Sequence, residues 1–195
     1  MGAGQGDTNV PSESGISGPA WTPDGRIVFE EELNGHRSIW SVDAAGNDRK
    51  QLTPEASNYD HSVSRNGQKL AFVSEWIAGF YADRTLNAET TPTSIAVIAS
   101  DGGPVRKVIP IPFSVMVSGG LRWNPNGREL SYIDRKKDGA NIWTQSLDGA
   151  APHQITRFQG VDLFSFDWSS DGKQLAISRG IETRDVVLME DAYRK

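Results

Sequence analysis

The chain has 195 residues, the size of a single domain that buries roughly two-thirds of its unfolded surface. Its 20 basic and 25 acidic residues give a formal charge of -5, the wrong sign for holding nucleic acid through phosphate contacts, so nucleic acid is not an expected partner. With no cysteine and three histidines, the chain can form neither disulfides nor thiolate metal sites.

Residues 1–15 show no periodicity and are rich in glycine and serine, so we predict a flexible lead-in. They lack a basic region followed by an apolar core, and no apolar run in the chain approaches the ~20 residues that a spanning helix needs. We therefore expect neither an export signal nor a membrane span in this chain. The compartment stays open; it would be periplasmic if the chain is part of a longer exported or membrane-anchored protein.

Four similar units follow, beginning with 16–53, and the third, 119–157, shows their pattern most clearly. Short runs are separated by turns at Asn126-Gly127 and Asp148-Gly149, and the run "RELSYID" alternates between two faces. Period-two alternation predicts half-buried strands, and Asn-Gly and Asp-Gly are the dipeptides that tight hairpins select. Each complete unit is therefore predicted to be a four-stranded antiparallel sheet.

The second unit, 59–110, contains an insertion of about eighteen residues from Trp76 to Thr93 between its second and third strands. The fourth unit, 163–190, ends after its third strand, and residues 191–195 form a short tail. The last unit is therefore predicted to be incomplete.

Hairpin glycines mark the repeat, because Gly25, Gly67, Gly127 and Gly172 are separated by 42, 60 and 45 positions. A spacing near 42 residues is typical of propeller blades, and the insertion accounts for the longest separation. The sequence thus predicts an all-β fold, a partial β-propeller of about four four-stranded antiparallel blades.

The segments "WTPDGRIVF", "WNPNGRELSY" and "WSSDGKQLAIS" resemble the W-S-P-D-G-K motif of the TolB-like propellers, which are built from WD40-like PD40 repeats. Such propellers usually have six blades, so the resemblance implies the C-terminal part of a six-bladed ring. The closing "FSFDWSSDGKQLAISRGIETRDVVLME" resembles the end of propellers fused behind bacterial serine/threonine kinase domains. The second unit departs from the motif, with Val63 at the tryptophan position and Arg65-Asn66 at the Pro-Asp position.

Five tryptophans recur at fixed repeat positions, and periodic aromatic residues are usually core. We predict that these five pack between blades: Trp21, Trp40, Trp123, Trp143 and Trp168. Trp76 lies outside the repeat, in the insertion. That insertion is either a lid packed on its own blade or an exposed contact surface.

Strand order places the loops between second and third strands, and the links between blades, on one face, which we call the top face. Loop length varies most there, so we expect it to bind a partner, either a protein or a small ligand. The candidate partner-binding residues are Trp76, Phe80, Tyr81, Arg84, Arg135, Lys136, Arg179 and Arg184. The alternative is an ordinary solvated charged face, because acidic residues are interleaved with the basic ones. Open edges on the first and last blades also predict self-association.

Signatures of catalysis and cofactor binding are missing from the sequence. "GAGQG" lacks the Lys-Ser/Thr ending of a phosphate-binding loop, "GISGP" is not a nucleophile elbow, and His36, His61 and His153 lie near different strand ends. We therefore expect no cofactor or metal, and a non-catalytic recognition module that acts as a sensor or scaffold, for example in a receptor-like serine/threonine kinase. The alternative is the propeller of a prolyl-oligopeptidase-like serine peptidase, which would need a hydrolase domain of a couple of hundred residues.

Overall fold

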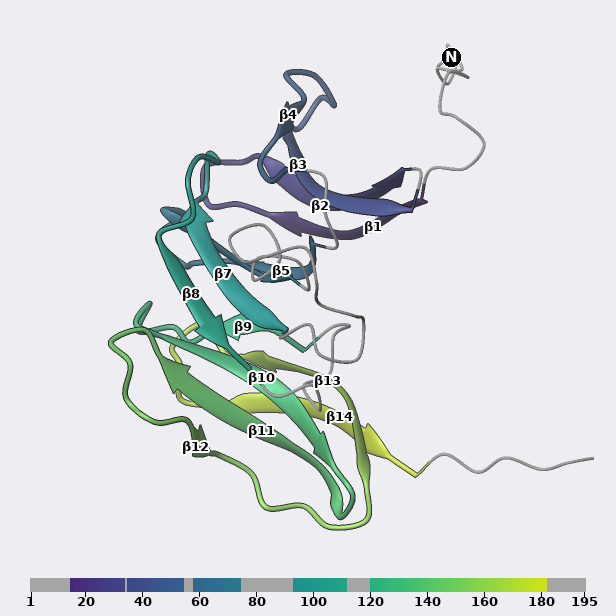
Figure 1. Ribbon diagram of the computed structural model, residues 1–195, viewed down its shortest axis with the longest axis vertical. Coiled ribbons are helices and arrows are strands. Elements are labelled where there is room, and N and C mark those ends of the chain that lie inside the picture. Colours follow the sequence, from purple (N-terminus) through teal and green to yellow (C-terminus); the bar gives the residue numbers. More distant parts are fainter. Residues whose placement is uncertain (1–14, 34, 55–57, 75–92, 112–119, 182–195) are drawn as a thin grey trace, which may run out of the picture.

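The structure is a computed structural model and describes residues 15–33, 35–54, 58–74, 93–111 and 120–181 (Figure 1). The regular structure in these ranges is entirely β, in three four-stranded antiparallel sheets and one sheet with two described strands. Within each sheet the strands are neighbours in chain order, as in a meander. The predicted all-β partial propeller is confirmed. None of the described segments forms a helix long and apolar enough to cross a membrane.

The blades are named A to D in chain order. Blade A contains β1 (Gly15–Trp21), β2 (Ile27–Leu33), β3 (His36–Val42) and β4 (Lys50–Gln51). Blade B contains β5 (Asn58–Val63), β6 (Lys69–Ser74), β7 (Ser94–Ala99) and β8 (Lys107–Pro110). Blade C contains β9 (Arg122–Trp123), β10 (Glu129–Lys136), β11 (Gly139–Ser146) and β12 (His153–Gln154). Blade D contains β13 (Asp162–Trp168) and β14 (Leu175–Gly180); its predicted third strand lies outside the described residues.

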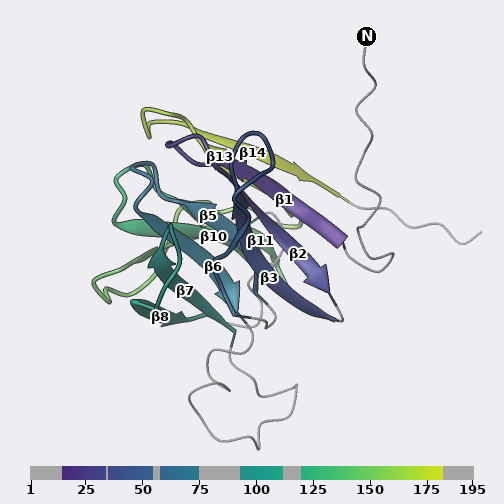
Figure 2. The ribbon, with the colours of Figure 1, turned by 90° about the horizontal axis from the view of Figure 1, so that it is seen from above.

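The blades are stacked face to face: blade A lies at the top of Figure 1, blade B lies below it, and blades C and D overlap in the lower part of the view. The short fourth strands β4, β8 and β12 line one side of the stack (Figure 1). Figure 2 looks along the stack with blade A toward the viewer. This arrangement sets the first strands of all four blades along one side of an arc.

Each of the three hydrophobic clusters lies at one junction between blades. The run "LAFV" of β6 shows why: Leu70 and Phe72 pack against blade A, whereas Ala71 and Val73 pack against blade C. A continuous apolar run is therefore buried on both faces of a central sheet. The A–B cluster contains Val28, Ile39, Leu52, Leu70, Phe72, Ala96 and Ile98. The C–D cluster contains Ile133, Ala140, Ile142, Leu163 and Phe166.

Trp123 confirms the prediction that the repeated tryptophans pack between blades. Its side chain is only 6 % exposed and lies in the B–C cluster. The indole Nε1 donates to the backbone oxygen of Ser62 at 3.0 Å, and the Trp123 backbone N–H donates to Ser62 Oγ at 3.1 Å. Trp143 and Trp168 are partly buried against the B–C and C–D clusters.

The same prediction was wrong for Trp21 and Trp40. Both lie on the face of blade A that points away from blade B, and no described blade packs against that face. Trp21 is 66 % exposed. Trp40 is covered instead by Arg49, whose guanidinium lies 4.2 Å from the ring centre and also bonds Glu31.

The β10–β11 hairpin makes the closest backbone approach to the link between blades C and D. Gly139 has a φ of 128°, and a Cβ there would lie 3.1 Å from Gly160 N and 3.3 Å from Val161 O.

Gly139→Ala should cost about 2 to 3 kcal/mol of unfolding free energy in a urea titration. The control Gly127→Ala, at a φ of 66° with open space around it, should cost about 1 kcal/mol. Equal losses of unfolding free energy in the two variants would show that the structure accommodates a Cβ at Gly139 with little strain.

A polar pocket on the inner strands

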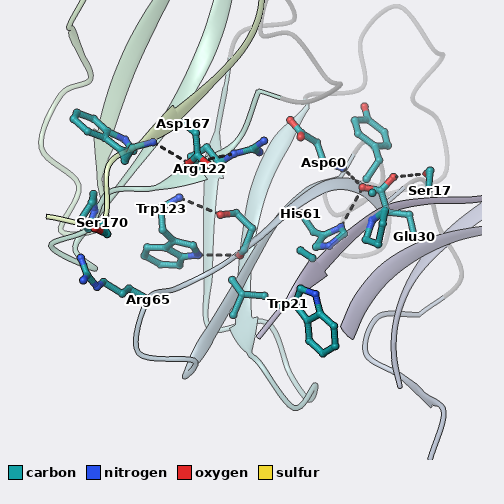
Figure 3. A pocket seen from close by; sticks show the side chains of 18 of the residues that line it. Ser17, Trp21, Glu30, Asp60, His61, Arg65, Arg122, Trp123, Asp167 and Ser170 are labelled. Atoms are coloured by element: carbon teal, nitrogen blue, oxygen red, sulfur yellow. Dashed lines mark hydrogen bonds and ion pairs between the residues drawn. The ribbon is translucent and has the colours of Figure 1, made fainter. Parts of the chain in front are cut away.

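A pocket with a volume of about 730 Å³ runs along the first strands of the four blades. Its wall includes residues 17–21 of β1, 59–63 of β5, 122–123 of β9 and 167–170 at the end of β13. Figure 3 shows this wall, with Trp21, Glu30 and His61 at one end and Arg65, Trp123 and Ser170 at the other. Four segments far apart in the sequence thus form one concave surface.

Glu30 of β2 is the centre of the polar network at the A–B junction. Its carboxylate accepts hydrogen bonds from Ser17 Oγ at 3.4 Å and from the Asp60 backbone N–H at 2.7 Å. His61 Nδ1 lies 3.2 Å from Glu30 Oε1 (Figure 3). Because side chains alternate along β2, Glu30 shares the inward face with Val28, which belongs to the A–B cluster. The carboxylate therefore points into the junction.

The Glu30–His61 pair occupies positions that are apolar at the other two junctions. Leu121 and Phe166 stand, like His61, six residues before the hairpin glycine of their blade. At the positions corresponding to Glu30, the preceding blade supplies Val73 to the B–C junction and Ile133 to the C–D junction. A carboxylate and an imidazole at the A–B junction thus stand where the other two junctions have apolar side chains.

Asp60 extends the network to the next blade. Its backbone has a φ of 52°, which is uncommon outside glycine, and its carboxylate accepts the Gly120 N–H at 3.1 Å. Burial raises the pKa of Asp60 to about 7, and the charge of Glu30 adds to that rise, while hydrogen bonds from Gly120 and Leu121 oppose it. The inner strands of blades A, B and C are therefore joined by one chain of polar contacts.

Glu30 stays ionised in spite of its burial. Burial disfavours the carboxylate, but the hydrogen bond and charge of His61 and the Asp60 N–H outweigh it, so the pKa of Glu30 is lowered. An ionised carboxylate is only an acceptor. The Glu30 carboxylate thus keeps its charge at this end of the pocket.

The pair does not form a catalytic triad within the described residues. Ser17 donates to Glu30 rather than facing His61 Nε2, and Ser62 Oγ accepts the Trp123 N–H. No hydroxyl is hydrogen-bonded to His61 Nε2, and the same ranges contain no group of three or more His, Asp or Glu that could hold a metal ion.

Three of the predicted partner-binding residues are described, and each contacts blade C or D. Arg135 donates to the Leu163 backbone oxygen at 2.9 Å; Lys136 lies 4.5 Å from the Trp143 ring centre; and Arg179 lies 4.5 Å from that of Phe158. None of the three lines the concave pocket. The other predicted residues lie outside the described ranges: Trp76, Phe80, Tyr81, Arg84 and Arg184. The top-face site therefore stays a prediction.

Comparisons with known proteins place these observations in a wider context. No family model matches the chain. The Tol-Pal system protein TolB of Thioalkalivibrio sulfidiphilus is 38 % identical over 40 residues, which are 20 % of this chain and 9 % of that protein. TolB from Acinetobacter baumannii matches structurally with a TM-score of 0.63 at 19 % identity, covering 86 % of this chain and 38 % of that one.

A puromycin-hydrolyzing peptidase from Mycobacterium tuberculosis is similar to the same extent. Its TM-score is 0.62 at 18 % identity, over 88 % of this chain and 28 % of the peptidase. The chain thus spans less than two thirds of the length of these proteins, and the structural similarity concerns the fold.

Proposed function

We propose that this chain, which has the fold of a TolB-like β-propeller, is a non-catalytic recognition module that binds a peptide segment of a partner protein along its inner strands. The observation that carries the proposal is the Glu30–His61 pair, because the fold itself does not require it. The B–C and C–D junctions are built with aliphatic and aromatic side chains at the same positions. Burying a polar pair is costly, so its presence beside a large pocket points to binding.

The pocket has the size and composition of a binding site for a short segment. Its volume falls within the range typical of ligand sites, and its wall combines tryptophans with a few placed polar groups. A role as the sensor or scaffold end of a receptor-like kinase remains a prediction from sequence resemblance. Self-association through the open edges of the first and last blades also remains a prediction.

The propeller of a serine peptidase is the second candidate, favoured by the structural similarity to the mycobacterial peptidase. The two candidates differ in what this chain does alone. A recognition module binds its peptide with these 195 residues, whereas a peptidase propeller contributes only part of a site shared with a hydrolase domain.

The test is a peptide selection followed by a double substitution. Peptides selected on the immobilised chain from a displayed library should bind by calorimetry, and the variant E30V/H61L should lose at least tenfold in affinity. This variant reproduces the Val73–Leu121 pair of the B–C junction, so it should fold with unchanged or greater stability.

The control is His153→Leu, which removes an exposed histidine from β12 far from the pocket. Affinity should remain unchanged in this control. If the selected peptides bind E30V/H61L as well as they bind the parent chain, the proposed recognition surface is wrong.

A further inference from the structure

The outer face of blade A, which points away from blade B, repeats a face that is packed elsewhere in the molecule. In blade C, the face packed against blade B is formed by two cross-strand pairs, Trp123–Leu130 and Tyr132–Trp143. The outer face of blade A has its counterparts at the same register positions, Trp21–Ile27 and Phe29–Trp40. Side chains paired across an antiparallel ladder lie on one face of the sheet. Blade A therefore presents the set of side chains with which blade C receives its neighbour.

No described blade covers this face, and its inner part is exposed. Arg49 lies over Trp40 toward the outer strands, where the counterpart Trp143 is only partly buried even in the packed B–C junction. Trp21 on the inner strand is exposed, whereas its counterpart Trp123 is buried. An exposed apolar face of this kind marks an interaction surface.

The outer face of blade D, which points away from blade C, is also uncovered among the described residues. Ile177 packs against blade C, so its neighbours Ala176 and Ser178 on β14 point the other way, and both are exposed. A Cβ at Gly180 would lie 3.1 Å from Phe164 Cε2. Because Gly180 alternates with Ala176 and Ser178, the Phe164 ring lies on the same outer face, where it is 46 % exposed.

This face of blade D corresponds to the face of blade B that packs on blade C. Tyr59 and Ala71 lie in the B–C cluster, eight residues before and four residues after the hairpin glycine of blade B. Phe164 and Ala176 stand at the same two positions of blade D. The two ends of the arc thus carry the two halves of the B–C junction.

We infer that this chain self-associates head to tail, with the outer face of blade D of one copy packed on the outer face of blade A of the next. In the B–C junction Trp123 Nε1 donates to the Ser62 backbone oxygen. In the contact between copies Trp21 Nε1 donates in the same way to the backbone oxygen of Asp167, which stands at the position of Ser62. The two faces differ, so the contact is heterologous.

The contact between copies is weaker than the junction that it repeats. Ser178 of blade D stands where blade B has the buried Val73, so the face of blade D offers less apolar surface. Association is therefore reversible, and the dilute chain is a single copy with Trp21 exposed. This inference does not rest on the proposed peptide-binding function, because the two faces act without any peptide.

Sedimentation of the chain at concentrations from about 5 to 500 µM tests the inference, because the weight-average mass should rise above that of a single copy. Trp21→Glu and Phe164→Glu each place a charge on one of the two faces and should raise the dissociation constant at least tenfold. Both side chains are exposed, so both variants should keep the circular-dichroism spectrum of the parent chain. The control Ile155→Glu charges an exposed apolar side chain outside both faces and should leave association unchanged.

Mixing the two variants tests the head-to-tail geometry. The Trp21→Glu chain keeps an intact blade D face, and the Phe164→Glu chain keeps an intact blade A face. Each variant alone should remain a single copy, whereas an equimolar mixture should form a complex of two chains and grow no further. A single-copy mass for the parent chain at every concentration, undiminished association of either variant alone, or no complex in the mixture would overturn the inference.

Discussion

Replacing Trp123 with alanine is expected to lower the free energy of unfolding by about 3 to 5 kcal/mol, as measured in urea titrations. The indole fills the junction between blades B and C and donates to the Ser62 backbone oxygen, so its loss leaves a cavity and an unsatisfied carbonyl. We attribute this loss of stability to the burial of the indole at the junction, and not to the position of the tryptophan in the repeat motif.

The matched control is Trp21→Ala, because Trp21 has the same position in its blade but is 66 % exposed. This substitution should change the stability by no more than about 0.5 kcal/mol. A loss at Trp21 as large as at Trp123 would mean that the outer face of blade A is covered in solution, for instance by a second copy.

Asp60→Asn is expected to stabilise the protein at pH 8 by up to about 4 kcal/mol and to have little effect near pH 4. The pKa of Asp60 rises from 3.8 to about 7 on folding, chiefly because the carboxyl is buried. Between these two values the folded chain holds a proton that the unfolded chain releases. This group therefore lowers stability progressively as the pH rises from about 4 to about 7, and asparagine removes that dependence.

Urea unfolding at pH 4.5, 6 and 8 would measure the difference between Asp60→Asn and the parent chain. Asp48→Asn is the matched control, since Asp48 has a similar φ of 49° but a side chain that is 77 % exposed. Its effect should stay within about 1 kcal/mol at every pH. Parallel stability curves for Asp60→Asn and the parent chain would contradict the raised pKa.

The repeat predicted the fold because local signals agree with it. Hairpin dipeptides, alternation and spacing all specify strands that form stacked sheets, and these signals act within each blade. Whether a tryptophan at a repeat position is buried depends instead on whether a neighbouring blade packs against it. Trp123 and Trp21 have the same local sequence pattern, yet only Trp123 has a blade packed on its face.

The polar pair was harder to predict because its orientation depends on hairpin length. Glu30 lies within three consecutive glutamates, which suggests a solvated face. In the first hairpin the Thr22 N–H bonds the Arg26 oxygen, whereas in blade C the Asn124 N–H bonds the Glu129 oxygen, one residue further on. A shift of one residue turns every side chain of a strand to the other face.

His61 could have been found by aligning the copies, because the corresponding positions hold Leu121 and Phe166. A polar residue at an otherwise apolar repeat position is the signal that sequence reasoning missed. Its partner on blade A, and the pocket that both residues line, depend on how the blades stack and so required the structure.

Each hydrophobic cluster joins two adjacent blades and none extends over three. Cooperativity in such an arc passes only between nearest neighbours, as in a one-dimensional chain of linked units. Blade D can therefore fray without disturbing the Glu30–His61 end of the wall, two junctions away. The geometry of that end is thereby insulated from fluctuations at the other.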